Sequence, residues 1–119
     1  MANILPKIMK KSLVINSELL GNGNKELGKK LMGSFLRTLW ANKNKPHTII
    51  LYNSAVKLIT KESLVLDAMD GLVKAGVDII ACGTCIEFFK LKDKVVTGRI
   101  SNMQEIVANL MESEQVITI

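Results

Sequence analysis

The sequence has few aromatic residues and little arginine. Phe, Trp and Tyr together make up 4% of the chain, and Arg37 and Arg99 are its only arginines. Proteins that bind nucleic acids commonly combine arginine-rich runs with aromatic side chains that stack on bases, whereas the lysines here are scattered. The formal net charge of +5 therefore favours solubility and the attraction of anions. We expect no nucleic-acid partner.

Long apolar runs are absent as well. No stretch approaches the ~20 residues of a membrane span, and the N-terminus lacks the apolar segment and small-residue cleavage site of a signal peptide. We therefore expect a cytoplasmic protein with no membrane partner. We interpret residues 1–11 as a lead-in or the remnant of a linker, and residues 12–119 as one domain, which is long enough for a single core.

Cysteine and histidine are scarce, which limits metal binding. Cys82 and Cys85 are the only cysteines, so a four-sulfur zinc site would lack its second pair. His47 is the only histidine and stands at the start of an expected strand, where we predict a surface imidazole. We expect no metal and no cofactor, and two thiols that stay reduced in the cytoplasm.

The most informative stretch runs from Val77 to Cys85. Its β-branched residues predict a short buried strand, and a helix is expected over 86–91. Both cysteines would then lie at the carboxyl end of a strand, beside a helix N-terminus that stabilises thiolates. The Cys-x-x-Cys spacing is compatible with redox exchange, with sulfur transfer, with half of a metal site, or with two small core residues.

Strands and helices alternate along the chain. Strands are predicted over 12–16, 47–52, 77–82, 95–100 and 115–119, and helices over 25–40, 63–75, 86–91 and 103–111. This alternation predicts an α/β fold: a three-layer sandwich with a parallel sheet covered by helices on both faces. In the first helix, Asn24 is the expected N-cap. The repeat of Leu27, Leu31, Phe35 and Leu39, joined by Met32 and Leu36, predicts the apolar face.

Two loops would lie at the same sheet edge as Cys82. The glycines of the 17–24 loop do not match the G-x-G-x-x-G spacing of a dinucleotide site. We therefore predict a flexible loop, with a phosphate cradle as the alternative. Residues 53–59 follow the second strand and include Lys57. That lysine is expected either to supply positive charge to a thiolate or anion, or to be an ordinary solvated side chain.

Several short segments together resemble a known family. These are residues 15–17, 20–23, 26–28, 52–58, 81–85 and 101–103, among which N-S-A-V-K-L and C-G-T-C are the most specific. They resemble the DsrE-like domain of the YedF selenium-metabolism proteins over roughly Ser12 to the C-terminus. The resemblance implies a mostly parallel five-stranded sheet, a homo-oligomer, and a cysteine that relays sulfane sulfur at the position of Cys82. YedF proteins commonly carry a preceding TusA-like domain with a Cys-Pro motif, for which residues 1–11 are too short.

Three functions follow as hypotheses. The first is a sulfur or selenium carrier: Cys82 takes a sulfane sulfur as a persulfide, and Cys85 protects, resolves or co-binds it. Its expected partner is a protein donor or acceptor of sulfur or selenium, for which a TusA-like domain is the candidate. Its predicted pocket consists of Asn16, Ser17, Gly21, Gly23, Asn53, Ser54, Lys57, Gly83 and Thr84.

The second hypothesis is a dithiol redox protein, in which Cys82 attacks and Cys85 resolves. The third is a non-enzymatic module that binds an anion or a protein and has inert thiols. The apolar residues Ile86, Phe88, Phe89 and Leu91 beside the cysteines are expected to serve either the core or a subunit interface.

Overall fold

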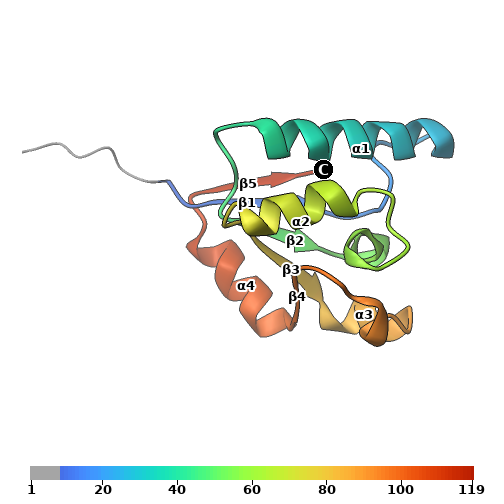
Figure 1. Ribbon diagram of the computed structural model, residues 1–119. Helices are drawn as coiled ribbons and strands as arrows, with labels where there is room; N and C mark the ends of the chain where they lie inside the picture. Colours follow the sequence, from blue (N-terminus) through green and yellow to red (C-terminus); the bar gives the residue numbers. More distant parts are fainter. Residues whose placement is uncertain (1–8) are drawn as a thin grey trace, which may run out of the picture.

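The computed structural model describes residues 9–119, which fold around one five-stranded sheet (Figure 1). All four strand pairings are parallel, and the strand order is β4-β3-β2-β1-β5. The strands are β1 (Lys11–Ile15), β2 (Thr48–Leu51), β3 (Asp78–Cys82), β4 (Arg99–Ser101) and β5 (Gln115–Thr118). The α/β fold with a parallel sheet is therefore confirmed. Of the expected lead-in, residues 1–8 lie outside the described residues, and Lys11 already belongs to β1.

The four α-helices follow the predicted order, with shifted ends, whereas the two 3-10 helices were not predicted. The helices are α1 (Lys25–Ala41), the 3-10 helix η1 (Asn53–Ile59), α2 (Leu66–Lys74), α3 (Gly83–Phe88), the 3-10 helix η2 (Lys92–Lys94) and α4 (Met103–Glu112). α2 begins three residues later than predicted. α3 begins three residues earlier, so that Cys85 lies inside this helix and not before it.

The two faces of the sheet are covered unequally because of the order of the strands. The chain moves in one direction from β1 to β4, and right-handed crossovers in one direction place their helices on one face. α1, α2 and η1 accordingly pack on one side, and α4, which leads back to β5, covers the other (Figure 1).

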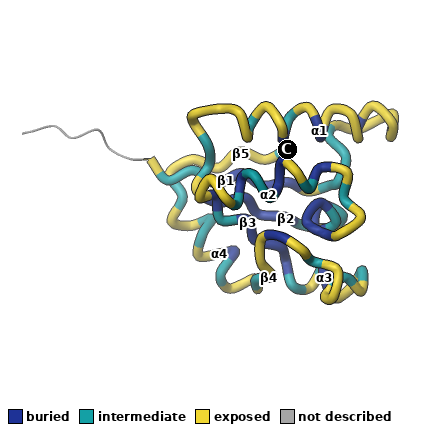
Figure 2. The backbone as a smooth tube through the Cα atoms, in the orientation of Figure 1, coloured by how far each residue is buried: buried dark blue, intermediate teal, exposed yellow. Residues whose placement is uncertain are grey.

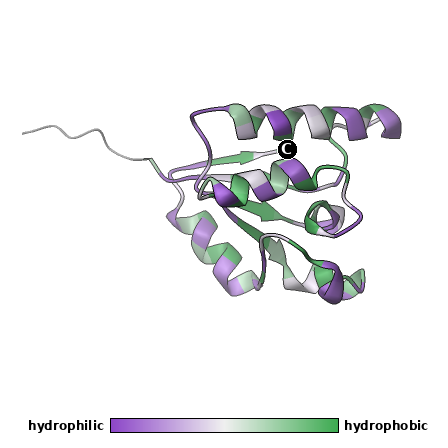
Figure 3. Ribbon diagram, viewed as in Figure 1, coloured by the Kyte–Doolittle hydropathy of each residue, from purple (hydrophilic) through white to green (hydrophobic). Residues whose placement is uncertain are grey.

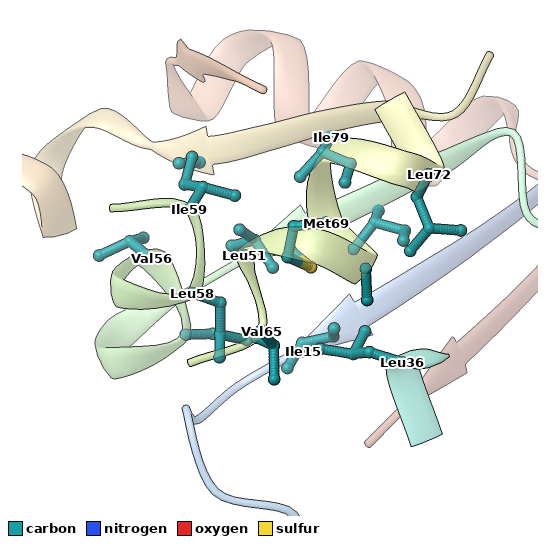
Figure 4. Packing of buried hydrophobic residues seen from close by; sticks show 14 of the residues in the cluster. Ile15, Leu36, Leu51, Val56, Leu58, Ile59, Val65, Met69, Leu72 and Ile79 are labelled. Atoms are coloured by element: carbon teal, nitrogen blue, oxygen red, sulfur yellow. The ribbon is translucent and has the colours of Figure 1, made fainter. Parts of the chain in front are cut away.

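The larger core lies under α1, α2 and η1. Successive strand residues point to opposite faces, so Ile15, Leu51 and Ile79 face this side and pack with Met69 and Leu72 of α2 (Figure 4). The smaller cluster, on the α4 side, contains Val14, Ile50, Ile80, Cys82 and Ile106. The inner strands β2 and β3 are buried, whereas the edge strand β5 is exposed throughout (Figure 2).

The predicted apolar face of α1 is wrong at its N-terminal end. Leu27 and Leu31 are 54% and 42% exposed, whereas Met32 and Leu36 of the predicted face are buried, together with Gly28 and Gly33. Apolar and polar residues alternate along α1 (Figure 3), but its first turns extend past the carboxyl end of β5 (Figure 1). There Gly28 approaches Leu19, which turns Leu27 towards solvent.

An arginine holds the β4 edge. Arg99 of β4 donates to both carboxylate oxygens of Asp78 at 2.9 Å and to those of Glu105 at 2.8 Å. The Ser101 hydroxyl also donates to Glu105. The hydrogen bonds from Arg99, followed by the one from Ser101, lower the pKa of Glu105 to about 2. β4 is thereby tied both to β3 and to α4.

The hydrogen bonds between Arg99 and Glu105 predict that acid lowers the stability of the fold. Because folding lowers the pKa of Glu105 from its usual ~4.3, its carboxylate stabilises the fold above about pH 4.3, and this stabilisation is lost as the pH falls towards 2. Glu105→Gln should lower the thermal midpoint near neutral pH, and the gap from the native protein should close in acid. Thermal unfolding followed by circular dichroism across this pH range measures it. A gap that does not change with pH would contradict the prediction.

A second prediction concerns the tight junction between β3 and β4. A β-carbon at Gly83 would lie 2.6 Å from the Ser101 carbonyl oxygen, which is backbone and cannot move aside easily. Gly83→Ala should therefore lower the free energy of unfolding by about 1–3 kcal/mol. Gly33→Ala is the matched control, because its closest neighbour is the movable end of the Arg37 side chain. Urea unfolding should separate the two, and equal stabilities would refute the account.

Candidate functional site

The carboxyl ends of three strands meet at one edge of the sheet. Ile15 pairs with Leu51, and Leu51 pairs with Ala81, so β1, β2 and β3 end side by side. The residues that follow, Asn16 and Tyr52, therefore lie in line with Cys82 at the end of β3. β3 is an interior strand between β2 and β4, and the middle strand of the sheet is β2.

Cys82 is almost fully enclosed. It is the last residue of β3, is 2% exposed, and belongs to the small cluster beneath α4 with Val14, Ile50 and Ile106. Its side chain shares this face with that of Ile80, because the two residues are two apart in the strand. The thiol thus occupies a packed apolar environment.

Cys85 is the more accessible thiol. It lies in the first turn of α3, is half-buried, and packs against both hydrophobic clusters. Both cysteines are free, and Cys85 packs against the cluster that contains Cys82. Burial is the main cause that raises the pKa of Cys85, the contact with Cys82 raises it further, and a hydrogen bond from the Asn53 backbone opposes the rise.

η1 brings two predicted pocket residues to this edge. The Asn53 N–H donates to Cys85 Sγ at 3.1 Å. The Ser54 hydroxyl accepts from the Glu18 N–H at 3.1 Å and donates to Ser17 Oγ at 3.4 Å. The structure therefore brings Asn53 to Cys85, and joins Ser54 to the 17–24 loop through Ser17.

The Lys57 side chain contacts an aromatic ring and is not paired with a thiol. Its Nζ lies 4.7 Å from the centroid of the Phe89 ring, a cation–π contact between η1 and the residue that follows α3. Lys57 also lines a cavity of about 410 Å³ with Leu19, Met32, Leu58 and Lys94. Among the described residues that form this cavity there is no cysteine.

Four other predicted pocket residues lie at the surface. Asn16 and Thr84 are exposed, and the Asn16 N–H donates to the Ile119 carbonyl at 3.3 Å. Gly21 and Gly23 have φ of +84° and +146°, and a β-carbon at either would meet no atom within 4 Å. Their structural role is the turn of the loop, and their role in a pocket stays a prediction.

Tyr52 is a site residue that the sequence did not reveal. It is partly buried against the small cluster beside Cys85, and burial, followed by the charges of Cys82 and Cys85, raises its pKa. The pairing of β2 with β3 places Tyr52 beside the cysteines. The sequence shows a tyrosine at the end of a predicted strand, but it does not show which strand pairs with that one.

The arrangement suits thiol chemistry better than metal chemistry. Within residues 9–119, no three or more His, Cys, Asp or Glu side chains form a group that could hold a metal ion. In the same part of the chain, no helix is long and apolar enough to cross a membrane. Two free cysteines that pack close together, one of them reachable, can accept and pass on another sulfur or join as a disulfide.

Comparison with solved structures shows the same fold in three proteins. A crystal structure of the ychN protein from E. coli superposes with a TM-score of 0.70 at 13% identity, covering 93% of this chain and 100% of the other. MTH1491 from Methanobacterium thermoautotrophicum gives 0.69 at 18% identity, covering 94% and 100%. BT1422 from Bacteroides thetaiotaomicron gives 0.64 at 20% identity, covering 92% and 95%. The latter two are described as proteins of unknown function.

Sequence comparison gives the family. A search of curated proteins finds no match. A family model described as DsrE/DsrF-like matches residues 21–119, which include β2 to β5 and both cysteines. The family-level resemblance of the sequence is thereby confirmed: the chain belongs to the DsrE/DsrF-like family.

Proposed function

We propose that this protein carries sulfane sulfur as a persulfide on the Cys82–Cys85 pair. The observation that carries the proposal is the close packing of two free cysteines where β3 ends, one enclosed and the other half-buried. Membership of the DsrE/DsrF-like family, with its association with sulfur relay, supports the same chemistry.

The reaction needs no outside oxidant. A thiolate of the pair attacks the outer sulfur of a donor persulfide, R–S–SH; a new S–S bond forms, the donor's S–S bond breaks, and R–S⁻ leaves. The proton lost by the cysteine balances the one that the leaving thiolate gains. The sulfur passes on by the same step when an acceptor thiolate attacks the outer sulfur of the loaded cysteine.

The proposed cargo and partner of this carrier rest on the resemblance to the YedF proteins. It supports selenium as an alternative cargo and a TusA-like domain as the donor or acceptor. A cytoplasmic location fits this chemistry, because reduced thiols persist there. The walls of the proposed pocket are Asn53, Ser54 and Ser17, with Lys57 close by on Phe89.

The close packing of the two cysteines also favours a second candidate, a dithiol redox protein. In that reaction both thiols lose their protons, and an oxidised partner takes two electrons as the Cys82–Cys85 disulfide forms. Enclosure of one sulfur and exposure of the other is the arrangement that such an exchange uses.

The first test is intact-mass spectrometry after incubation with inorganic polysulfide. The native protein should gain the mass of one sulfur atom, and dithiothreitol should remove it. The matched control is the double variant Cys82→Ser, Cys85→Ser, which should gain nothing. A loss of two hydrogens that needs both cysteines would replace the carrier with the dithiol protein. No change in the folded native protein would contradict both.

We also propose that the protein forms a homo-oligomer, with Phe88 in the interface. Ile86 is buried, whereas Phe88 is 79% exposed and stacks edge-on against Phe89, with ring centroids 5.3 Å apart. The other apolar residues of the segment, Phe89 and Leu91, are partly buried in the core. A large exposed aromatic side chain next to the thiols supports a contact surface at this point.

Light scattering tests the oligomer. The native protein at micromolar concentration should have a mass above that of one chain, and Phe88→Asp should shift it towards the monomer, because a charge replaces buried aromatic surface. Lys90→Asp changes a neighbouring exposed residue and is the control. A monomeric native protein would contradict the proposal.

A further inference from the structure

Building on the proposed function, we infer that Cys85 is the thiol through which sulfur enters and leaves, and that Asn53 is the positioning residue that holds it by a left-handed backbone turn. The sequence resemblance points instead to Cys82 as the acceptor. The inference therefore reverses the order of the two thiols and gives the backbone of Asn53 a defined task.

The first observation is the difference in burial. Cys82 is 2% exposed, and its neighbours Ile50, Ile80 and Ile106 are fully enclosed. An added sulfur atom at Cys82 would have to enlarge this packed cluster, and overpacking a core is costly. Cys85 is only half-buried, so an added sulfur atom there need not enlarge the core.

The second observation is the backbone of Asn53. Its φ is +51°, a conformation that few residues other than glycine adopt but that asparagine tolerates better than most. Such outliers cluster at functional sites, where the surrounding structure enforces them. The turn comes directly after Tyr52, and it aims the Asn53 N–H at Cys85 Sγ, 3.1 Å away.

Both sides of this turn are anchored. Before it, the Tyr52 N–H donates to the Ile15 carbonyl at 3.0 Å, which fixes the end of β2 to β1. After it, the Ala55 N–H donates to the Tyr52 carbonyl at 3.0 Å, and Ser54 binds the Glu18 N–H. The N–H that meets the sulfur is thus held by the sheet itself, and little rearrangement is needed when charge develops on Cys85.

The hydrogen bond acts in the direction that sulfur transfer needs. A donor on a thiolate favours the charged, nucleophilic form. For Cys85, burial and the neighbouring Cys82 both oppose that form. The Asn53 N–H counteracts them more strongly than the backbone of Cys85 itself does. Lys57 is engaged on Phe89 and so is not the cation of this thiol.

The sulfur steps then use Cys85 alone. The Cys85 thiolate attacks the outer sulfur of the donor persulfide, the donor leaves as its thiolate, and Cys85 holds the persulfide. An acceptor thiolate attacks the outer sulfur and releases the Cys85 thiolate, so atoms and electrons balance in both steps. Cys82 remains a packed neighbour in the thiol form.

The experiment measures how fast iodoacetamide alkylates Cys85 as a function of pH, in a Cys82→Ser background. Asn53 is changed to Gly, Ala and Val, which tolerate a left-handed turn progressively less well. Asn53→Gly should keep the native profile. Asn53→Val should shift the midpoint of the pH–rate profile of Cys85 alkylation upward by about one pH unit, because a hydrogen bond to a charged group is lost.

Lys90→Val is the matched control, since it carries the same backbone cost without a thiol contact. Lys90 has φ +57°, and its N–H donates to the Glu87 carbonyl at 3.1 Å. The Lys90→Val substitution should leave the pH–rate profile of Cys85 alkylation unchanged. Asn53→Ala covers the case in which Asn53→Val does not fold, as judged by circular dichroism. Profiles that are the same for Gly, Ala and Val would overturn the positioning role.

Polysulfide loading tests the order of the thiols separately. Cys82→Ser should still gain one sulfur, and Cys85→Ser should gain none. The reverse pattern would overturn the inference while leaving the carrier function intact. If no variant or native protein gains sulfur, the carrier function fails, and the alkylation series still decides whether Asn53 positions Cys85.

Discussion

Parallel pairing of β1, β2 and β3 is the constraint on which the site depends. With Ile15, Leu51 and Ala81 in register, three separate stretches of chain leave the sheet at the same edge. This register brings the 17–24 loop, η1 and α3 together. They are far apart in the chain, because more than thirty residues separate Ser17 from Ser54 and Asn53 from Cys85. The hydrogen bonds between these segments depend on the parallel pairing of β1, β2 and β3, and a shift of strand register would break them.

The same constraint explains why the two cysteines differ. Strand geometry turns Cys82 to the α4 side of the sheet, where Ile106 closes over it, while Cys85 lies one helical turn later at the sheet's end, between the two clusters. One chain segment therefore presents an enclosed thiol and a reachable one packed close together. Burial favours the neutral thiol, and the backbone N–H of Asn53 offsets part of that cost without a buried cation.

The edge of the sheet beside this site is held by short-range packing and charge together. Gly83 allows the Ser101 carbonyl to approach the start of α3, and Arg99 joins Asp78 to Glu105 across β3, β4 and α4. β4 has only three residues and little buried apolar surface of its own. Its position depends on this contact and this ion network, and so does the α3 segment that carries Cys85.

By itself the sequence determined the elements, their order and the place of the cysteines, because these depend on local patterns. β-branched runs predicted the strands, Asn24 caps α1 as predicted, and Cys82 lies at the end of a strand. The tertiary structure alone decided which strands are neighbours and which way side chains face. It exposed Leu27 and Leu31, turned Lys57 to Phe89, brought Tyr52 beside the thiols, and gave Asn53 its left-handed turn. These features arise from contacts between residues far apart in the chain, and periodicity along one segment carries no information about the segment packed against it.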